Sequence, residues 1–455
     1  MEPRNMQPME ELSLQTMKET QSEYEQRCLE TLETALRRTA VYRSWKTFDP
    51  GPREGIDARY HCLPILTKDD IRAYFPKGVV PAGLDLDAAL SNGEVSFVRT
   101  SGTADEALEN IWNQQWWNAS ERASWKLNAV AAATATGEHR EAILASALSV
   151  GPRSERDLID RKDRMLGRFL FLNEFSVPAE WPEGHEARML RELSDYQPAV
   201  LEANPSLLDR LARFAWKTGA AVYQPPLITL TYEFPSALQL RAIRRVFRSC
   251  IASSYGSTEA GYVFMECEHG RLHQNAEFCR VDFAPLTGVA GGQAKVGRIF
   301  TTTFGNKWFP LVRFDIGDIA RLAAEPCPCG RNFGMTLAGI EGRLKSLCLR
   351  ADGGLVTHRE LDEALACVEG LEQYRLVQES PGRVCLDIVG EDGRGRRTAR
   401  GAGEVLEGLF GRGMEIVVNE VPVLRPERSG KFLLAKREFP LGPDVATPRT
   451  EALNG

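Results

Sequence analysis

The chain has 455 residues, a net charge of −6, a hydrophobic fraction of 43% and a charged fraction of 26%. This length accommodates roughly two to four domains, and the composition is that of an ordinary globular protein. The acidic balance argues against a nucleic-acid-binding protein. No apolar run reaches the roughly 20 residues of a membrane span, and the first residues have no signal-peptide core. We therefore expect a cytoplasmic protein with neither a nucleic-acid nor a membrane partner.

The first predicted elements are helical. Residues 1–20 are polar and predict a flexible tail. Apolar residues then recur at helical spacing from Tyr24 to Trp45. Further along, Thr67 stands before an acidic first turn and is placed to cap another helix.

A hydroxyl-rich loop follows a short apolar strand at residues 95–98 and consists of Thr100, Ser101, Gly102 and Thr103. Backbone N–H groups and hydroxyls in such loops bind phosphate, although an ordinary turn has the same composition. The tryptophan-rich segment from Ile111 to Trp125 is predicted to be helical. Its rings favour core packing, with an acyl pocket as the alternative.

The middle of the chain alternates helical and strand-like runs over residues 126–250, which is typical of an α/β region. Ala203 ends a strand and leads into a capped helix, and residues 228–234 predict another strand. Residues 297–322 are rich in strands, residues 341–345 read as a linker, and residues 390–403 read as a charged loop.

The predicted fold is therefore α/β with two domains. After the tail at 1–20, we expect a large N-terminal domain over residues 21–341 and a small, mobile α+β domain over residues 342–455. The short strands and two helices of this second domain end in a glycine-lysine turn at Gly430 and Lys431.

One stretch, Ser253–Gly261, combines small residues, hydroxyls and a single carboxylate. Glycine lets the backbone approach a ligand closely, and hydroxyls donate to phosphate oxygens. A carboxylate holds the Mg²⁺ that accompanies a nucleoside triphosphate. A polar turn between buried elements is the alternative for this stretch taken alone.

In this order, the motifs resemble those of the adenylate-forming enzymes, specifically the phenylacetate–CoA ligase and coenzyme F390 synthetase-like branch. The resemblance implies that Thr100-Ser101-Gly102-Thr103 begins the phosphate-binding loop. It implies that Tyr255, Gly256 and Ser257 contact the nucleotide, that Thr258 meets phosphate and that Glu259 binds Mg²⁺.

The resemblance also covers the second half of the chain. It implies that Asp318 holds the ribose hydroxyls and that Arg343 contacts ribose and phosphate. Lys345 falls at the hinge before the mobile domain, and Lys431 matches the lysine that bridges the carboxylate and the α-phosphate. Because two anions must meet in this reaction, cations such as Lys431 are needed to stabilise the phosphoryl group.

The expected activity is ATP- and Mg²⁺-dependent ligation. An aryl or arylacetic acid would become an acyl-adenylate and then pass to CoA. After Thr103 the sequence continues Ala104-Asp105-Glu106-Ala107 where the family has Thr-Gly-x-Pro, and the segment 344–357 departs from the usual glycine-rich form. Because of these departures, two alternatives stay open. The acceptor could be an amine or another small nucleophile in place of CoA, or the protein could be a non-catalytic nucleotide-binding homologue. The expected partners are ATP and a small carboxylate, with a homodimer left open.

Cysteine and histidine spacing indicates a metal site. Cys327 and Cys329 form a Cys-x-Cys turn, and Cys267 and His273 lie about 60 residues earlier, with His269 as a spare candidate. Four S and N ligands make a closed, structural Zn²⁺ site, as the family branch also carries. A closed thiolate site argues against a zinc hydrolase. Cysteines elsewhere are predicted to pack in the core: Cys28, Cys62, Cys348, Cys367 and Cys385.

Overall fold

The computed structural model describes residues 7–100, 107–289, 295–391 and 395–442, with side chains from residue 20 onward. The α-helices are α1 Gln7–Arg38, α2 Ile56–Cys62, α3 Lys68–Tyr74, α4 Leu86–Ser91, α5 Gln114–Trp125, α6 Ala129–Thr134, α7 His185–Tyr196, α8 Pro205–Thr218, α9 Ala237–Val246, α10 His358–Leu365 and α11 Gly395–Phe410. Short 3₁₀ helices are η1 Ala40–Thr47, η2 Lys77–Val79, η3 Arg161–Arg164, η4 Pro178–Glu180 and η5 Leu344–Ser346.

The strands of the large, N-terminal part are β1 Ser96–Arg99, β2 Glu109–Trp112, β3 Glu141–Leu144, β4 Met165–Leu166, β5 Phe169–Phe171, β6 Val200–Ala203, β7 Leu227–Leu230, β8 Cys250–Ser257, β9 Gly261–Glu266, β10 Leu272–Gln274, β11 Cys279–Pro285, β12 Val296–Thr303, β13 Phe314–Leu322 and β14 Thr336–Arg343. The later strands are β15 Cys348–Leu349, β16 Leu355–Val356, β17 Leu371–Ser380, β18 Arg383–Gly390, β19 Glu415–Glu420 and β20 Ala435–Arg437.

One twelve-stranded sheet organises the large part, in the order β11-β12-β13-β14-β10-β9-β8-β7-β6-β3-β5-β4. Strands β5, β3, β6, β7 and β8 run parallel to one another, whereas β8 pairs antiparallel with β9. The sheet therefore changes character at β8, which carries the first part of the Ser253–Gly261 stretch. In α/β sheets, ligands bind beyond the carboxyl ends of the parallel strands, and this stretch lies at the carboxyl end of β8.

Two helices that begin at this edge of the sheet are capped by local sequence. Asn204 accepts hydrogen bonds from the backbone N–H groups of Ser206 and Leu207, and Pro205 occupies the first turn of α8. Ser236 and Gln239 form a reciprocal capping box at the start of α9. Both helix N-termini consequently lie just after the carboxyl ends of β6 and β7.

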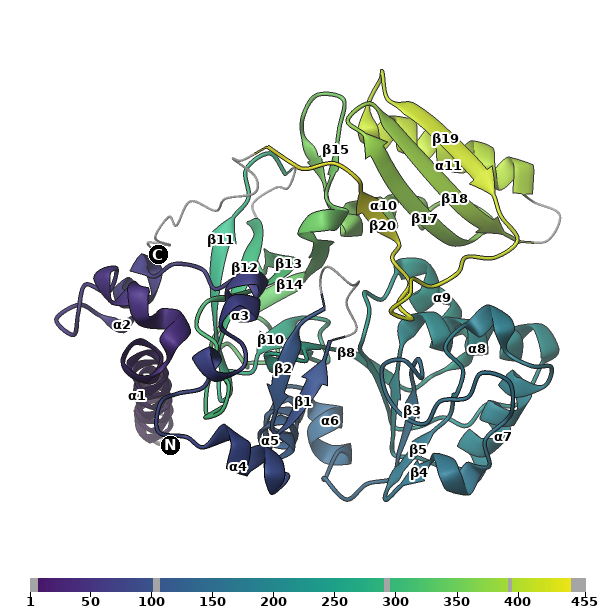
Figure 1. The fold of residues 1–455 in the computed structure, drawn as a ribbon. Coiled ribbons are helices and arrows are strands. Elements are labelled where there is room, and N and C mark those ends of the chain that lie inside the picture. The colour runs from purple at the N-terminus through teal and green to yellow at the C-terminus, as the bar shows by residue number, and fades with distance from the viewer. Residues whose placement is uncertain (1–6, 101–106, 290–294, 392–394, 443–455) are drawn as a thin grey trace, which may run out of the picture.

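The C-terminal part forms its own four-stranded sheet in the order β19-β18-β17-β20, with α10 and α11 in the same hydrophobic cluster. It lies above the large sheet at the upper right of Figure 1. The α/β prediction is confirmed by this architecture. The small unit has the predicted strands and helices, although α11 begins at Gly395 and replaces much of the charged loop expected at 390–403.

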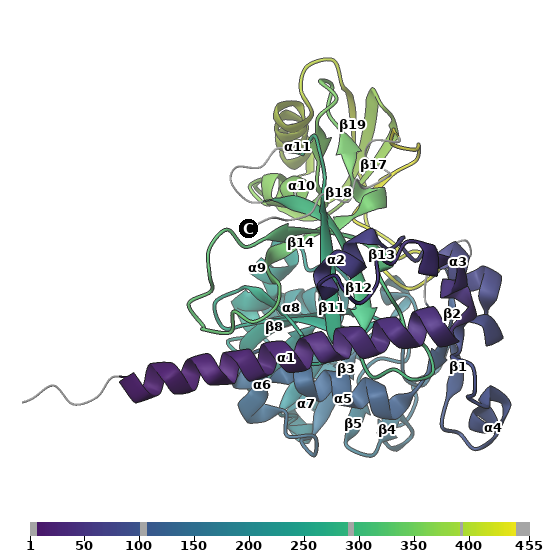
Figure 2. The same cartoon turned by 90° about the vertical axis from the view of Figure 1, so that its left-hand side faces the viewer.

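Two other local predictions differ from the structure. Residues 7–20 belong to α1, which projects from one side of the molecule in Figure 2, because strong helix formers continue the helix toward the N-terminus. The linker expected at 341–345 is the end of β14 followed by η5. Glu341 is buried and receives hydrogen bonds from Arg321 and Thr357, so packing holds this segment in the sheet.

The tryptophan-rich segment is divided between two elements. Its first residues, Ile111 and Trp112, form the end of β2, and α5 begins only at Gln114 after the Asn113 cap. Within the described ranges, no helix is both long enough and apolar enough to cross a membrane.

Candidate active site

The Ser253–Gly261 stretch is built as the end of one strand and the turn into the next. Tyr255, Gly256 and Ser257 belong to β8, and Thr258 and Glu259 form the turn toward β9. The carbonyl oxygen of Thr258 accepts a 2.7 Å hydrogen bond from Asn110 Nδ2 of β2. This segment could be located from the sequence. Only the sheet shows that it ends β8, the strand at which parallel pairing changes to antiparallel pairing.

The strands that flank the predicted phosphate loop reach this turn through Asn110 of β2. Ser101, Gly102 and Thr103 fall outside the described residues, whereas Thr100 is described and its Oγ1 accepts a 2.9 Å hydrogen bond from Leu108 N. The flanking strands β1 and β2 form an antiparallel hairpin. Because Asn110 joins β2 to Thr258, the two ends of this loop are held close to the central stretch.

Asp318 and Arg343 come together through strand register. They are paired opposite each other on β13 and β14, and Arg343 Nε lies 3.3 Å from Asp318 Oδ1. The Tyr255 hydroxyl donates a 2.7 Å hydrogen bond to Asp318 Oδ2. A carboxylate has about four acceptor positions, so both oxygens retain capacity for ribose hydroxyls.

The Lys431 loop reaches the same edge from the C-terminal unit. Lys431 precedes β20, which pairs in parallel with β17, so the lysine is tethered to the small sheet. A tight turn is closed by hydrogen bonds from Gly430 N to Glu427 O and from Glu427 N to Lys431 O, each 2.8 Å. Gly430 has φ +77°, and a Cβ there would meet Ser146 Oγ at 2.4 Å, so this contact requires glycine.

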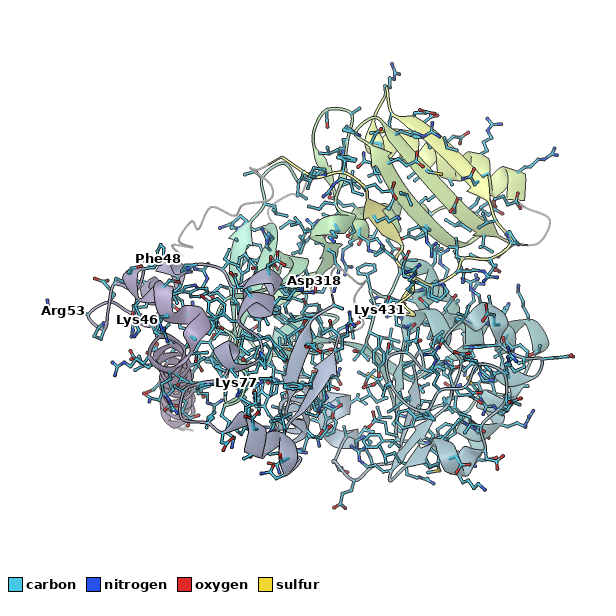
Figure 3. The ribbon with its side chains drawn as sticks, in the orientation of Figure 1. Lys46, Phe48, Arg53, Lys77, Asp318 and Lys431 are labelled. Carbon is cyan, nitrogen blue, oxygen red and sulfur yellow. The ribbon has the colours of Figure 1, made fainter. Side chains whose placement is uncertain are left out.

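Charged groups from four further segments surround Lys431. Burial and the neighbouring Arg343 guanidinium lower the pKa of Lys431, while the carboxylates of Glu233, Asp318 and Glu259 act to raise it. Figure 3 shows Asp318 and Lys431 near the middle of the molecule, below the C-terminal sheet. The structure thus brings together the residues that sequence analysis placed at the carboxylate, ribose and magnesium positions.

Two expectations concern the border of the C-terminal part. Lys345 is exposed in η5, immediately after β14, at the border where the hinge was predicted. The strand predicted over residues 228–234 ends at Leu230, and Phe234 beyond it packs on His358 of α10, with ring centroids 4.4 Å apart.

Sequence analysis missed Glu233, which follows β7 at the same sheet edge. Its Oε1 accepts a 2.8 Å hydrogen bond from Phe432 N, and its Oε2 accepts a 2.6 Å hydrogen bond from Ser206 Oγ. Burial raises the pKa of Glu233, opposed by these hydrogen bonds and by the charge of Lys431. The one feature of the sequence that could have indicated Glu233 is its position as a carboxylate shortly after a strand of buried, partly β-branched residues.

The predicted metal ligands converge. Ligand atoms of Cys267, His273, Cys327 and Cys329 all lie within 4.8 Å of one another, whereas His269 is not in the group. The Sγ atoms of Cys267 and Cys327 are 3.7 Å apart, close to the roughly 3.8 Å edge of a tetrahedron with Zn–S bonds of about 2.3 Å. Cys329 Sγ lies 3.2 Å from His273 Nε2. The donor set and spacing fit Zn²⁺.

Surrounding groups orient these ligands. Thr336 Oγ1 lies 3.3 Å from His273 Nδ1, leaving Nε2 to face the thiols. Burial lowers the pKa of His273, which favours the neutral imidazole that ligates metals. Backbone N–H groups of His269 and Arg331 each lie 3.4 Å from a cysteine sulfur.

Elsewhere, Cys62 and Cys367 are exposed, contrary to the expectation of core packing, because helix ends place them at the surface.

A second group of carboxylates lies behind the central stretch. Glu121 of α5 accepts a 2.9 Å hydrogen bond from the Tyr262 hydroxyl, and Glu202 of β6 accepts one from Tyr232. Burial, and then the nearby Glu141 carboxylate, raise the pKa of Glu121 to about 7. Buried carboxyls with raised pKa values are more stable in the fold when protonated.

The raised pKa of Glu121 predicts a loss of stability as pH rises from about 4.5 to about 7, because the folded state holds this proton longer than the unfolded state. Glu121→Gln should remove part of this loss. Relative to the wild type, the variant should gain roughly 1–2 kcal/mol in unfolding free energy at pH 8 and little at pH 4.5. Urea unfolding at both pH values measures the difference, with the exposed Glu138→Gln as control. An equal effect at both pH values would contradict the prediction.

No family model matches the chain. In sequence it is 24% identical over 224 residues to Protein CapK of Staphylococcus aureus, covering 48% of each chain. It is 26% identical over 209 residues to phenylacetate-coenzyme A ligase of Thermus thermophilus, covering 44% of this chain and 46% of that protein. The chain therefore matches about half the length of these curated relatives.

Solved structures share the fold over a longer span. A 2-hydroxyisobutyryl-CoA ligase in the postadenylation state superposes with a TM-score of 0.66 and 16% identity, covering 91% of this chain and 89% of that one. The same ligase in the thioesterification state gives a TM-score of 0.55 with 16% identity, covering 92% and 90%. The chain thus shares its fold with this 2-hydroxyisobutyryl-CoA ligase, and about half of its sequence is similar to Protein CapK and to a phenylacetate-coenzyme A ligase.

Proposed function

We propose that this protein uses ATP to convert a carboxylic acid into an acyl-adenylate and then transfers the acyl group to CoA. The observation that carries the proposal is the gathering of Lys431, Asp318, Glu259 and Arg343 around one point, from two parts of the chain. The shared fold and the phenylacetate-coenzyme A ligase relative support the same class of reaction. An aryl or arylacetic acid is the proposed substrate class, in keeping with the phenylacetate ligase relative.

Each side chain has a distinct task in the proposed adenylation step. Lys431 would lie between the substrate carboxylate and the α-phosphate, where its positive charge offsets two approaching anions. Asp318 would accept hydrogen bonds from the ribose hydroxyls, with Arg343 beside it at 3.3 Å. The attacking carboxylate oxygen forms a bond to the α-phosphorus as the bond to pyrophosphate breaks.

Glu259 is the proposed Mg²⁺ ligand. Its side chain is buried, and among the described residues no hydrogen-bond donor is paired with its carboxylate, so its oxygens can face a cation. When bound, Mg²⁺ supplies positive charge to the triphosphate. Tyr255, Gly256, Ser257 and Thr258 would contact the nucleotide along the end of β8, and the loop that begins at Thr100 is proposed to bind its phosphates.

We also propose that residues 342–455 act as a lid that presents Lys431 for adenylation and then turns about Lys345 for acyl transfer. The better superposition on a ligase in the postadenylation state supports this assignment of the present orientation. The Cys267, His273, Cys327 and Cys329 group is proposed to hold a structural Zn²⁺, which would join the loop before β14 to the β9–β10 hairpin.

A direct test is pyrophosphate release across a panel of carboxylic acids, each assayed with CoA, with an amine and without an acceptor. Acid-dependent release with thioester formation is the expected result, and it should be strongest with aryl and arylacetic acids. Amide formation in place of thioester would support the alternative acceptor. Nucleotide binding without release for any acid would support the non-catalytic homologue and contradict the proposal.

The role of Asp318 predicts a defect specific to ATP. Asp318→Ala should raise the KM for ATP by about tenfold or more, because charge-assisted hydrogen bonds to ribose are worth roughly 1.5–3 kcal/mol. The KM for the acid should change little. Steady-state kinetics with each substrate varied measures the difference, and Asp69→Ala is the control because that side chain is 90% exposed. Equal changes in both KM values would remove Asp318 from ribose binding.

A further inference from the structure

Glu233 forms a contact between the large sheet and the Lys431 loop. Each of its two carboxylate oxygens accepts one hydrogen bond: Oε1 from Phe432 N at 2.8 Å, and Oε2 from Ser206 Oγ at 2.6 Å. Phe432 directly follows Lys431, so this hydrogen bond restrains the backbone at the lysine. The charge of Glu233 also acts on Lys431 itself.

A chain of buried polar groups holds Glu233 in place. Ser206 Oγ accepts a 3.0 Å hydrogen bond from Gln239 Nε2, and Gln239 Oε1 accepts one from Ser236 N at 2.9 Å. Ser206 lies in the first turn of α8, and Gln239 lies in the first turn of α9. Gln239 holds Ser206 and Ser206 holds Glu233, so the first turns of α8 and α9 fix the orientation of the Glu233 side chain.

Other contacts join the C-terminal unit to the large part away from the lysine. Ala237 N donates to Asp362 Oδ2 at 2.7 Å, Arg241 Nη2 donates to Ala366 O at 2.5 Å, and Arg213 Nη2 donates to Glu372 O at 3.0 Å. These contacts orient the unit as a whole. Glu233 differs because it touches the loop that delivers the lysine.

We propose that Glu233 is a positioning residue that seats residues 427–432 on the carboxyl end of β7 and thereby places Lys431 for the first half-reaction. This inference rests on the proposed function. The seat is formed on one side by Glu233 and on the other by the contact of Gly430 with Ser146. When the lid turns for acyl transfer, the hydrogen bond from Phe432 N to Glu233 breaks, so Glu233 contributes nothing to the second half-reaction.

Two variants separate the hydrogen bond from the charge. Glu233→Ala removes both, whereas Glu233→Gln keeps a carbonyl oxygen that can accept from Phe432 N. We expect Glu233→Ala to lower kcat for acid-dependent pyrophosphate exchange on the order of a hundredfold, because small displacements of a reacting group have effects of that size. The KM values should change less than threefold. Glu233→Gln should recover at least tenfold of the lost kcat.

A second readout does not require catalysis. Hydrogen–deuterium exchange of the peptide covering 427–434 should be at least tenfold faster in Glu233→Ala than in the wild type, and close to wild type in Glu233→Gln. Asp362→Asn is the matched control, since Asp362 also accepts a backbone N–H across the same interface. It should leave exchange at 427–434 unchanged.

The two readouts distinguish the possible failures. If no acid supports pyrophosphate exchange in the wild type, the proposed function fails, while the exchange of residues 427–434 still reports on the seat. Unchanged protection in Glu233→Ala would overturn the inference. It would also be overturned if Glu233→Ala slowed transfer to CoA from a supplied acyl-adenylate as much as it slowed adenylation, because the seat acts in the first step only.

Discussion

Replacing Lys431 by alanine is expected to lower acid-dependent pyrophosphate exchange by about a hundredfold to a thousandfold. A single preorganised donor to a developing charge contributes an effect of this size. The carboxylates of Glu233, Asp318 and Glu259 act to raise the pKa of Lys431, but burial and the Arg343 guanidinium lower it. The charge is therefore costly in the folded state, and its removal should leave the melting temperature unchanged or slightly higher.

The matched control for Lys431→Ala is Lys436→Ala. Lys436 belongs to β20 on the same segment and pairs with Glu438 at 3.1 Å, away from the site. Its replacement should leave exchange within twofold of the wild type. The measurement is isotope exchange between pyrophosphate and ATP, with thermal unfolding of each variant. Full exchange activity in Lys431→Ala, or equal losses in both variants, would show that Lys431 has no special role.

The second large effect is expected from the cysteine–histidine group. Purified protein should contain about one zinc per chain, and Cys327→Ser should abolish stoichiometric binding because a closed tetrahedral site needs all four ligands. The melting temperature should fall by about 5 °C or more, since zinc joins Cys327 and Cys329 to the β9–β10 hairpin. Elemental analysis and thermal unfolding, with and without a chelator, measure both effects.

Cys367→Ser is the control for the zinc prediction. Cys367 is an exposed free thiol after α10, outside the metal group. This variant should keep its zinc and its melting temperature. If the wild type contained no zinc after purification without chelator, or if Cys327→Ser and Cys367→Ser were equally stable, the group would be three free cysteines and a histidine and not a metal site.

Several features of this protein follow from the sequence by itself. Helix caps such as Thr67 depend on neighbouring residues, and the structure contains the predicted Thr67 cap, which forms a capping box with Asp70. The α/β character, the small C-terminal unit and the grouping of the four cysteine and histidine side chains were also predictable, because alternation, turn residues and Cys-x-Cys spacing are local patterns.

Only the tertiary structure decided which of these residues come into contact with one another. The pairing of Asp318 with Arg343 depends on the register of β13 and β14. The change from parallel to antiparallel pairing at β8 depends on its two neighbours, β7 and β9. Glu233 was missed because nothing beside it in the sequence signals its partner, Phe432, which lies almost 200 residues away. Residues 341–343 read as a linker, but they form strand because Glu341 is buried against Arg321 and Thr357. Local patterns specify elements, whereas long-range hydrogen bonds and burial decide which side chains share a site.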